Sequence, residues 1–402
     1  MSEVVTETVR RRPKDRKQRI EAAAAEAFSA HGFHAVGMED IAAAVGVSAP
    51  ALYRHYPSKY ALFVACARGL AAGLLDGIDQ VPASDDPDDR LDALVAAVLK
   101  VTVANRSTGG LYRWEGRYLA PEHRAEIGEQ FDRLTATIAD ALLEVRGDLQ
   151  PVVADRVASG ALAVIASITA HRTSLGVRRM DRVLGGAAHR VLRVSIDGVE
   201  APTIERTDQE PIGGRRELLL SKAITLFNRR GYHDVGIDEI ATAAGLTPSG
   251  VYRHFSGKSD ILYAACIRAA ERLTQVTADA TARAGSDPAG ALQSMGRAYI
   301  RFAFEQHELL SVYSADATSL PEQDLARLLA LQREHVAEWV NRLRAVHPSL
   351  DLPSARILVH AALGVVVDGG RRSHWSDDPA VVRCVAAMVD AVLDPPDTDL
   401  GR

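Results

Sequence analysis

"HGFHAVGMEDIAAAVGVSAPALYRHYPSK", residues 31–59, decides the fold, because a close copy of it, "RGYHDVGIDEIATAAGLTPSGVYRHFSGK", stands at residues 230–258. The two copies align without an insertion at a constant offset of 199 residues. Outside them, Trp114 corresponds to Tyr313 and Ser174 to Ser373 at the same offset. The chain is therefore predicted to be a duplication that covers the whole of each half.

Each copy predicts three short helices followed by a long one. The short helices are expected over residues 14–31, 39–45 and 48–55 in the first copy and over 216–230, 238–244 and 247–254 in the second. The turn before each third helix is formed by Gly46 or Gly245, because a positive φ is favourable for glycine. Ser48 and Thr247 are placed to cap the third helix. This pattern is typical of a helix-turn-helix unit that binds DNA.

The composition indicates a soluble, all-α protein with more than one domain. The 402 residues include 25% charged and 5% aromatic residues, and few segments alternate as strands do. No apolar run approaches twenty residues and the N-terminus is charged, so we expect no membrane span or secretory signal and a cytoplasmic location. The three cysteines have no metal-ligand spacing and are interpreted as core residues in a reducing compartment.

The charge is unevenly distributed, although the net charge is only −5. Arginine and lysine crowd residues 10–19, next to the first helix-turn-helix, while aspartates cluster at residues 85–89. A basic segment at one end of an acidic protein favours local DNA binding over a general DNA coat. A solvated, disordered arm is the alternative interpretation.

Breaks in the helical pattern divide the chain into six segments. We expect a disordered basic arm (1–13), a first DNA-binding domain (14–62), a first effector and pairing domain (63–194), a linker (195–213), a second DNA-binding domain (214–261) and a second effector and pairing domain (262–397).

The helix-turn-helix units resemble the DNA-binding domain of the TetR family of bacterial repressors. The resemblance rests on "Gly-Phe-His-Ala-Val" (32–36), "Asp-Ile-Ala-Ala-Ala-Val-Gly-Val-Ser" (40–48) and "Leu-Tyr-Arg-His-Tyr-Pro-Ser-Lys" (52–59), and it occurs twice. Most members have about half this length and bind DNA as homodimers. The opening residues 9–17 are similar to those of double-length actinobacterial members, some of which control lipid-uptake and lipid-degradation operons.

The third helix of each unit is expected to enter the major groove with its first residues toward the bases. Ala49 offers a methyl contact to thymine, and Arg54 is suited to guanine. The resemblance implies phosphate contacts for Tyr53, His55 and Lys59. The predicted DNA-contacting residues are Arg11, Arg12, Lys14, Ser48, Ala49, Pro50, Tyr53, Arg54, His55 and Lys59 in the first half, and Thr247, Pro248, Ser249, Tyr252, Arg253, His254 and Lys258 in the second.

Each of these assignments has a structural alternative. Tyr53 and its counterpart Tyr252 would be core aromatics, Arg54 would pair with Asp40, and Lys59 would be a solvated helix start. The first residues of the third helix, here called its tip (48–51 and 247–250), differ between the halves, while the Tyr-Arg-His that follows is the same in both. The two units are therefore predicted to read DNA half-sites of different sequence.

The resemblance also implies an effector cavity in each larger domain. Candidate lining residues are Tyr112, Trp114, Tyr118, Phe131 and His171 in the first half, and Phe302, Phe304, His307, Tyr313 and Trp339 in the second. Candidate polar groups are Arg113, Glu115, Arg117 and Arg172 in the first half, and His335, Arg371, Arg372 and His374 in the second. The alternative is an ordinary helix-bundle core with surface charges.

The function predicted from these observations is an effector-responsive transcriptional repressor. Its partners would be a double-stranded DNA operator and a small apolar effector, by analogy lipid-like or an acyl thioester. Activators or architectural factors without effector control, and an interaction scaffold that has lost DNA, are the alternatives. No catalytic, cofactor or metal motif is found, so an enzyme is not expected. Residues 154–172 and 354–367 would pair the halves into an internal pseudo-dimer, with a homodimer of two chains as the alternative.

Overall fold

The computed structural model describes residues 13–111, 116–205 and 214–396, and from residue 16 on it describes their side chains. Every regular element in these ranges is a helix, which confirms the predicted all-α class. The first half comprises α1 (Pro13–His31), α2 (Met38–Val45), α3 (Ala49–Tyr53), α4 (Lys59–Asp79), α5 (Pro87–Ala104), η1 (Gly116–Tyr118), α7 (Pro121–Val145), α8 (Pro151–Ala166), η2 (Ser167–Ala170) and α9 (Val177–Leu192).

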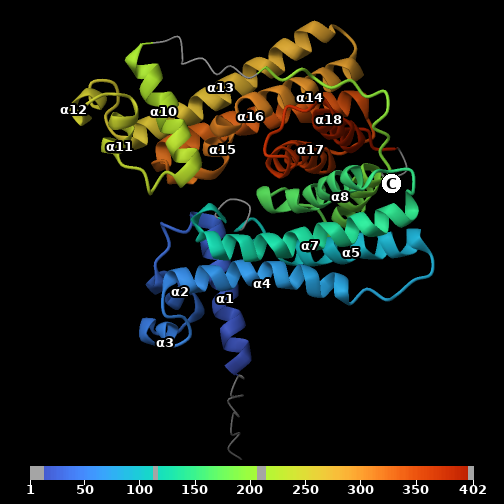
Figure 1. The fold of residues 1–402 in the computed structure, drawn as a ribbon, viewed down its shortest axis with the longest axis horizontal. Coiled ribbons are helices and arrows are strands. Elements are labelled where there is room, and N and C mark those ends of the chain that lie inside the picture. Colours follow the sequence, from blue (N-terminus) through green and yellow to red (C-terminus); the bar gives the residue numbers. More distant parts are fainter. Residues whose placement is uncertain (1–12, 112–115, 206–213, 397–402) are drawn as a thin grey trace, which may run out of the picture.

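The second half repeats this order after residue 213. It comprises α10 (Arg215–Arg230), α11 (Ile237–Ala243), α12 (Pro248–Val251), α13 (Lys258–Ala284), α14 (Pro288–Glu305), α15 (His307–Asp316), η3 (Ala317–Ser319), α16 (Glu322–Val346), α17 (Leu352–Arg372) and α18 (Pro379–Leu393). Two copies of one helical unit stand side by side in Figure 1, the first in blue to green and the second in yellow to red.

Each helix-turn-helix folds from the local signals in its sequence. Gly46 and Gly245 have φ values of 73° and 66°, as the predicted turns require. The predicted third helices are too long, because α3 ends at Tyr53 and α12 at Val251. The residues that follow form turns in which His55 N–H donates to the carbonyl of Leu52 at 2.9 Å.

The three short helices of each unit share a small core with the start of the following long helix. Phe28 of α1, Ile41 of α2, Leu52 of α3 and Leu62 of α4 are fully buried in one cluster. Burial of a large side chain stabilises the fold by about 1.5–3 kcal/mol. The first and third helices are therefore packed into one core.

The halves join through a bundle of α8, α9, α17 and α18, in which α8 packs along α17 and α9 along α18. This confirms the predicted pairing of residues 154–172 with 354–367. The helices approach closely at Gly160, where a β-carbon would stand 2.1 Å from the Met388 sulfur. Arg372 of α17 also donates to Asp155 of α8 at 2.7 Å. One chain thus forms the pseudo-dimer by itself.

The expectation that no apolar run approaches twenty residues is wrong. Three segments are long and apolar enough to cross a membrane by length and composition: Lys59–Asp79, Pro151–Ala170 and Leu352–Arg372. In this fold they are α4, α8 with η2, and α17, and each packs against several other helices of the chain. Their apolarity therefore has a structural explanation in the packing of the larger domain of each half and of the four-helix bundle.

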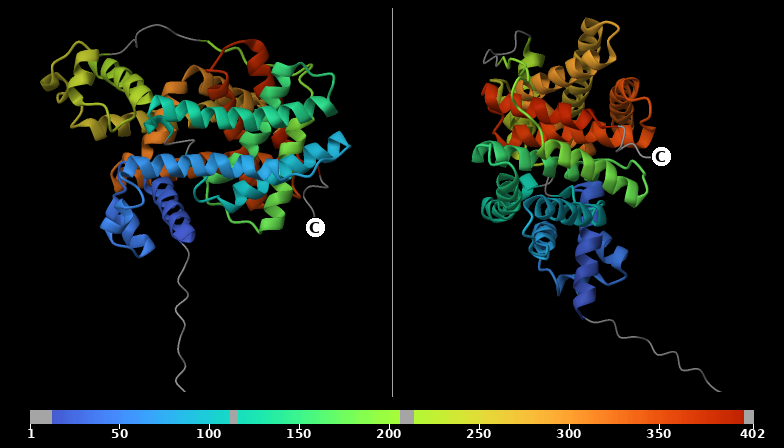
Figure 2. Two further views of the ribbon diagram at one scale, coloured as in Figure 1. Left: turned by 60° about the horizontal axis from the view of Figure 1, so that its bottom comes forward. Right: turned by 90° about the vertical axis from the view of Figure 1, so that its right-hand side faces the viewer.

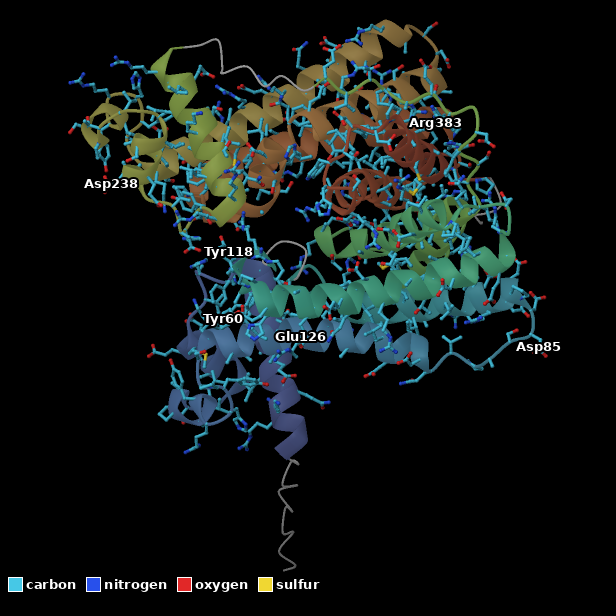
Figure 3. The ribbon with its side chains drawn as sticks, in the orientation of Figure 1. Tyr60, Asp85, Tyr118, Glu126, Asp238 and Arg383 are labelled. Carbon is cyan, nitrogen blue, oxygen red and sulfur yellow. The ribbon has the colours of Figure 1, made fainter. Side chains whose placement is uncertain are left out.

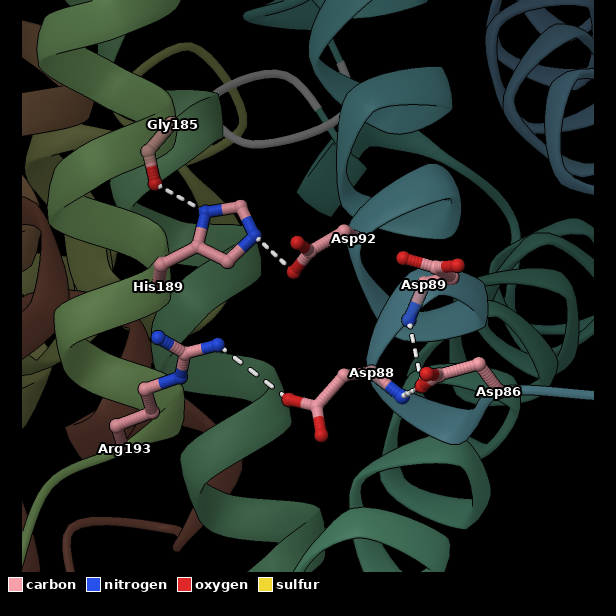
Figure 4. Close-up of polar contacts among 7 residues, drawn as sticks. All are labelled: Asp86, Asp88, Asp89, Asp92, Gly185, His189 and Arg193. Atoms are coloured by element: carbon pink, nitrogen blue, oxygen red, sulfur yellow. Dashed lines mark hydrogen bonds and ion pairs between the residues drawn. The ribbon is translucent and has the colours of Figure 1, made fainter.

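The acidic cluster after α4 serves helix capping and packing (Figure 4). Asp86 accepts hydrogen bonds from the backbone N–H groups of Asp88 and Asp89 and caps α5. Asp92 pairs with His189 of α9 at 2.7 Å, and Asp88 pairs with Arg193 at 3.4 Å. These contacts fasten α5 to α9 at the end of the molecule opposite the helix-turn-helix units.

Candidate nucleic-acid interface

Both third helices, α3 and α12, lie at the same end of the molecule, one in the lower and one in the upper unit (Figures 1 and 2). The four-helix bundle occupies the other end. The two helix-turn-helix units therefore present their third helices at one end of the molecule.

Tyr53 and Tyr252 project from these helices into solvent. Their side chains are 51% and 57% exposed, which excludes the interpretation of both as core aromatics. The predicted tips are open as well: Ser48, Pro50, Thr247, Pro248 and Ser249 are exposed and Ala49 is half-buried. A phenol hydroxyl is a suitable donor to a phosphate oxygen.

Arg54, His55 and Arg253 are also exposed, and His254 is half-buried. Among the described residues no ion pair joins Arg54 to Asp40. The Asp40 carboxylate instead accepts a hydrogen bond from the Gly37 N–H at 2.8 Å, at the start of α2. The guanidinium of Arg54 therefore faces solvent beside the tip.

Lys59 and Lys258 are half-buried and tie the long helices to the loops before α2 and α11. Lys59 Nζ donates to the carbonyls of Phe33 at 2.8 Å and His34 at 3.3 Å, and Lys258 does the same with Tyr232 and His233. Burial lowers the pKa of both amines. A lysine ammonium has three donors, so a phosphate contact would use the third.

The two units touch each other through these same loops. The rings of His34 and His233 stack at a centroid distance of 4.4 Å, with planes 24° apart. Tyr118 lies beside them at the junction of the halves (Figure 3), so close to Gly231 that a β-carbon there would stand 2.8 Å from its ring. These contacts hold the two DNA-binding domains against each other.

Each half also contains a cavity. The first-half cavity, about 590 Å³, lies among α4, α5, α7 and α8 and is lined by Leu74, Val98, Phe131, Thr135 and Leu162. The second-half cavity, about 490 Å³, is lined by Leu273, Tyr299, Tyr313, Gln332 and His335 of α13 to α16. Both volumes fall in the range of roughly 300–1,000 Å³ that is usual for small-molecule sites.

Phe131, His171 and Tyr313 line these cavities, as do the predicted polar candidates Arg117, Arg172, His335, Arg371 and Arg372. Tyr118 lies instead at the junction of the DNA-binding domains, while Phe304 and His307 pack against Trp375. Phe302 and Trp339 are buried in the core. Tyr112, Trp114, Arg113 and Glu115, and Arg11 and Arg12 of the arm, lie outside the described residues, as does the side chain of Lys14.

The predicted polar residue His335 lines the second-half cavity. Both ring nitrogens of His335 are buried without a hydrogen-bond partner, and burial lowers the pKa of this side chain to about 4. Tyr299 and Gln332 line the same cavity and were not predicted. Tyr299 lies three residues before Phe302 on α14, and Gln332 three residues before His335 on α16, so that only the three-dimensional packing shows which of them line the cavity.

The comparisons agree with this architecture. The family description "Bacterial regulatory proteins, tetR family" matches residues 20–66 and again residues 219–265. The HTH-type transcriptional activator FasR of Mycolicibacterium smegmatis is 31% identical over 157 residues, which are 38% of this chain and 71% of FasR. The HTH-type transcriptional repressor KstR2 of Rhodococcus jostii is 28% identical over 123 residues, 29% of this chain and 60% of KstR2.

Solved structures are similar to one half at a time. A TetR-family regulator from Bordetella parapertussis is 20% identical, with a TM-score of 0.42, and covers 46% of this chain and 97% of its own. A tetR-family protein from Rhodococcus RHA1 is 26% identical, with a TM-score of 0.39, and covers 44% of this chain and 95% of its own. With two family matches in one chain and the relationship to FasR, the chain belongs to the TetR family of bacterial transcriptional regulators, as a double-length member.

Proposed function

We propose that this protein is a cytoplasmic repressor that binds an asymmetric, two-part operator with both helix-turn-helix units of one chain and is released by a small apolar effector. The observation that carries the proposal is the pair of exposed, non-identical tips held at one end of a covalent pseudo-dimer. Tyr53 and Arg54 recur as Tyr252 and Arg253, while "Ser-Ala-Pro-Ala" (48–51) is replaced by "Thr-Pro-Ser-Gly" (247–250).

Residues that are the same in both helix-turn-helix units and residues that differ between them have different roles in this proposal. Phosphate contacts position a protein on DNA without reading sequence, and contacts to base edges specify it. Tyr53, His55 and Lys59 and their counterparts would position each unit. The tips would read two half-sites whose centres are about 34–36 Å apart, or a modest multiple of that spacing. A homodimer reads two equal half-sites, whereas a fused pair reads unequal ones.

The two cavities support an effector of mostly apolar character. Apolar surface makes up the larger part of each wall, and polar groups that would orient a ligand are added to it: four arginines and two aspartates in the first-half cavity, and three histidines and Arg172 in the second-half cavity. A lipid-like molecule or an acyl thioester fits this description. Release would follow from a higher affinity of the effector for a conformation in which the two third helices no longer match the groove spacing.

The experiment begins with an operator selected from genomic fragments by the purified protein. Palmitoyl-CoA is then titrated into the complex, with coenzyme A alone as the control for the polar part of the thioester. We expect the thioester to raise the operator Kd at least about tenfold, which is a coupling of about 1.4 kcal/mol. If a panel of acyl chain lengths leaves Kd unchanged at saturation, control by an acyl effector is wrong.

An activator is the second candidate, favoured by the relationship to FasR, which is named as an activator. The two outputs use the same DNA contacts and differ only in where the operator lies. A reporter fused to the operator region separates them. Loss of the protein raises reporter expression if it represses and lowers expression if it activates.

A further inference from the structure

The two cavities are equivalent sites of the duplication. Leu74 on α4 and Leu273 on α13 stand 199 residues apart and each lines the cavity of its own half. Thr135 on α7 and His335 on α16 are related by 200 residues and do the same. Features that both cavities share therefore follow from the duplicated fold and not from the local packing of one half.

One shared feature is that the DNA-binding domain of the opposite half contributes to the wall of each cavity. Ser29, in the last turn of α1, lines the second-half cavity together with Ala30 and Gly32. Its counterpart Asn228, 199 residues later in the last turn of α10, lines the first-half cavity. Each DNA-binding domain thus lines the cavity of the other half, and it does so from equivalent positions.

Residues at the ends of α8 and α17 also line the cavity of the opposite half. His171 and Arg172, which follow α8 of the first half, line the second-half cavity. Arg371 and Arg372, at the end of α17, line the first-half cavity. From sequence, each of these pairs is expected in the cavity of its own half. The correction arises because α8 and α17 cross at the four-helix bundle, so that the end of each helix reaches its neighbour.

Besides the contacts within each half, a short path leads from each cavity to the tip of the opposite half. Within one half, Leu74 is 15 residues into α4 from Lys59, about 22 Å of helix. Across the halves, Ser29 is next to Phe28, which is fully buried in the same core as Leu52 of the reading helix α3. A shift of the α1 end is passed directly to α3, because packed cores move as units.

We infer that the control is crossed: an occupant of the second-half cavity acts on the first DNA-binding domain, and an occupant of the first-half cavity acts on the second. This rests on the proposed function in taking the cavities as effector sites. The cavities differ in chemistry at equivalent positions, with Asp132 and Thr135 in the first and Gln332 and His335 in the second. Two different ligands would then each control binding to the DNA half-site that is read by the half opposite its cavity.

The test uses tryptophan as a permanent occupant in the free, full-length protein. Leu273→Trp fills the second-half cavity and Leu74→Trp the first-half cavity. Leu352→Trp, at a position that is 47% exposed, is the matched control. Amide hydrogen exchange is followed in peptides covering residues 29–58 and 228–257, and far-ultraviolet circular dichroism confirms that each variant is folded.

We expect Leu273→Trp to raise exchange at least threefold in residues 29–58 and to leave residues 228–257 unchanged, with Leu74→Trp giving the reverse. A larger change in the unit of the same half, an equal change in both units or no change in either overturns the inference. His335→Trp and Thr135→Trp form a second pair should a leucine variant fail to fold. Because this readout needs no DNA, a protein that binds no operator would refute the proposed function and leave the crossed coupling testable.

Discussion

Arg117 and Asp316 occupy the same position in the two halves, 199 residues apart, and they form an ion pair with each other. The Arg117 Nη1 donates to Asp316 Oδ2 at 3.0 Å, and the carboxylate also accepts the backbone N–H of Tyr232 at 3.3 Å. A homodimer of either half would place two arginines or two aspartates at this point. The pair is favourable only because the halves have diverged within one chain.

Removal of Arg117 is expected to be costly, because the Asp316 side chain is only 1% exposed. Burial raises the pKa of Asp316, and the guanidinium opposes this effect. Arg117→Ala should destabilise the fold by about 3–5 kcal/mol, since it leaves a buried carboxylate without its partner. The urea midpoint of unfolding measures this loss. The double variant Arg117→Met/Asp316→Leu should recover most of it, and an equal loss in both variants would contradict the pair's role.

The stacked histidines predict a loss of stability in acid. Burial lowers the pKa of His34 and His233, that of His233 to about 4, although Asp234 raises both and Lys59, Lys258 and Arg117 lower His34 further. An unfolded histidine titrates near 6.5, so the unfolded state binds more protons between pH 6.5 and 4. The stability that the neutral stack contributes is present above pH 6.5 and is lost as the pH falls toward 4.

The double variant His34→Gln/His233→Gln isolates this contribution from other buried histidines, such as His171 and His360, whose pKa values burial also lowers. Urea midpoints of the wild type and the variant are compared from pH 7.5 to 4.5. The wild type should lose more stability than the variant over this range. Parallel curves would show that the stack does not titrate in the folded protein.

The exposed tyrosines are expected to matter for DNA and not for folding. Tyr53→Ala and Tyr252→Ala should each raise the operator Kd about fivefold, which corresponds to one hydrogen bond of about 1 kcal/mol. Because both side chains are more than half exposed, the melting temperature should change little. Fluorescence anisotropy with a labelled operator measures Kd, and Tyr→Phe at each position tests whether the hydroxyl carries the effect. An unchanged Kd at position 252 alone would identify the second unit as one that no longer contacts DNA.

The tips are expected to determine which half-site is read. Replacing residues 48–51 with Thr-Pro-Ser-Gly gives the first unit the tip of the second. Binding selection from a library with a randomised first half-site should then recover the sequence of the second half-site, because base contacts carry about 1–3 kcal/mol per base pair. The reciprocal exchange at residues 247–250 is the matched control. Retention of the original preference would place sequence reading outside the tips.

The sequence predicts the helix-turn-helix units well because their signals are local. Gly46 and Gly245 mark turns within a few residues of the helices they join, and the duplication makes each prediction twice. The pairing of the late helices follows from their small apolar residues, such as Gly160 beside Met388. The ends of the third helices are less predictable, since Arg54 and His55 form a turn in which the His55 N–H donates to the carbonyl of Leu52 at 2.9 Å.

Contacts across the pseudo-twofold axis could not be predicted from local patterns. His34 and His233 stand at equivalent positions of the two halves, and only the fold brings their rings together. The cavity residues show the same limit. Phe302 and Trp339 have the spacing of helix faces, and that spacing does not distinguish a face toward the core from one toward a cavity.

The measurement that tests the account most directly is the mass of the protein–operator complex, by native mass spectrometry at low micromolar concentration. The account predicts that the free protein is a single 43.2 kDa chain and that the complex contains one chain for each two-part operator. Two chains on one operator would contradict it, because four reading helices would then share a longer site and the pseudo-dimer would not be the DNA-binding unit.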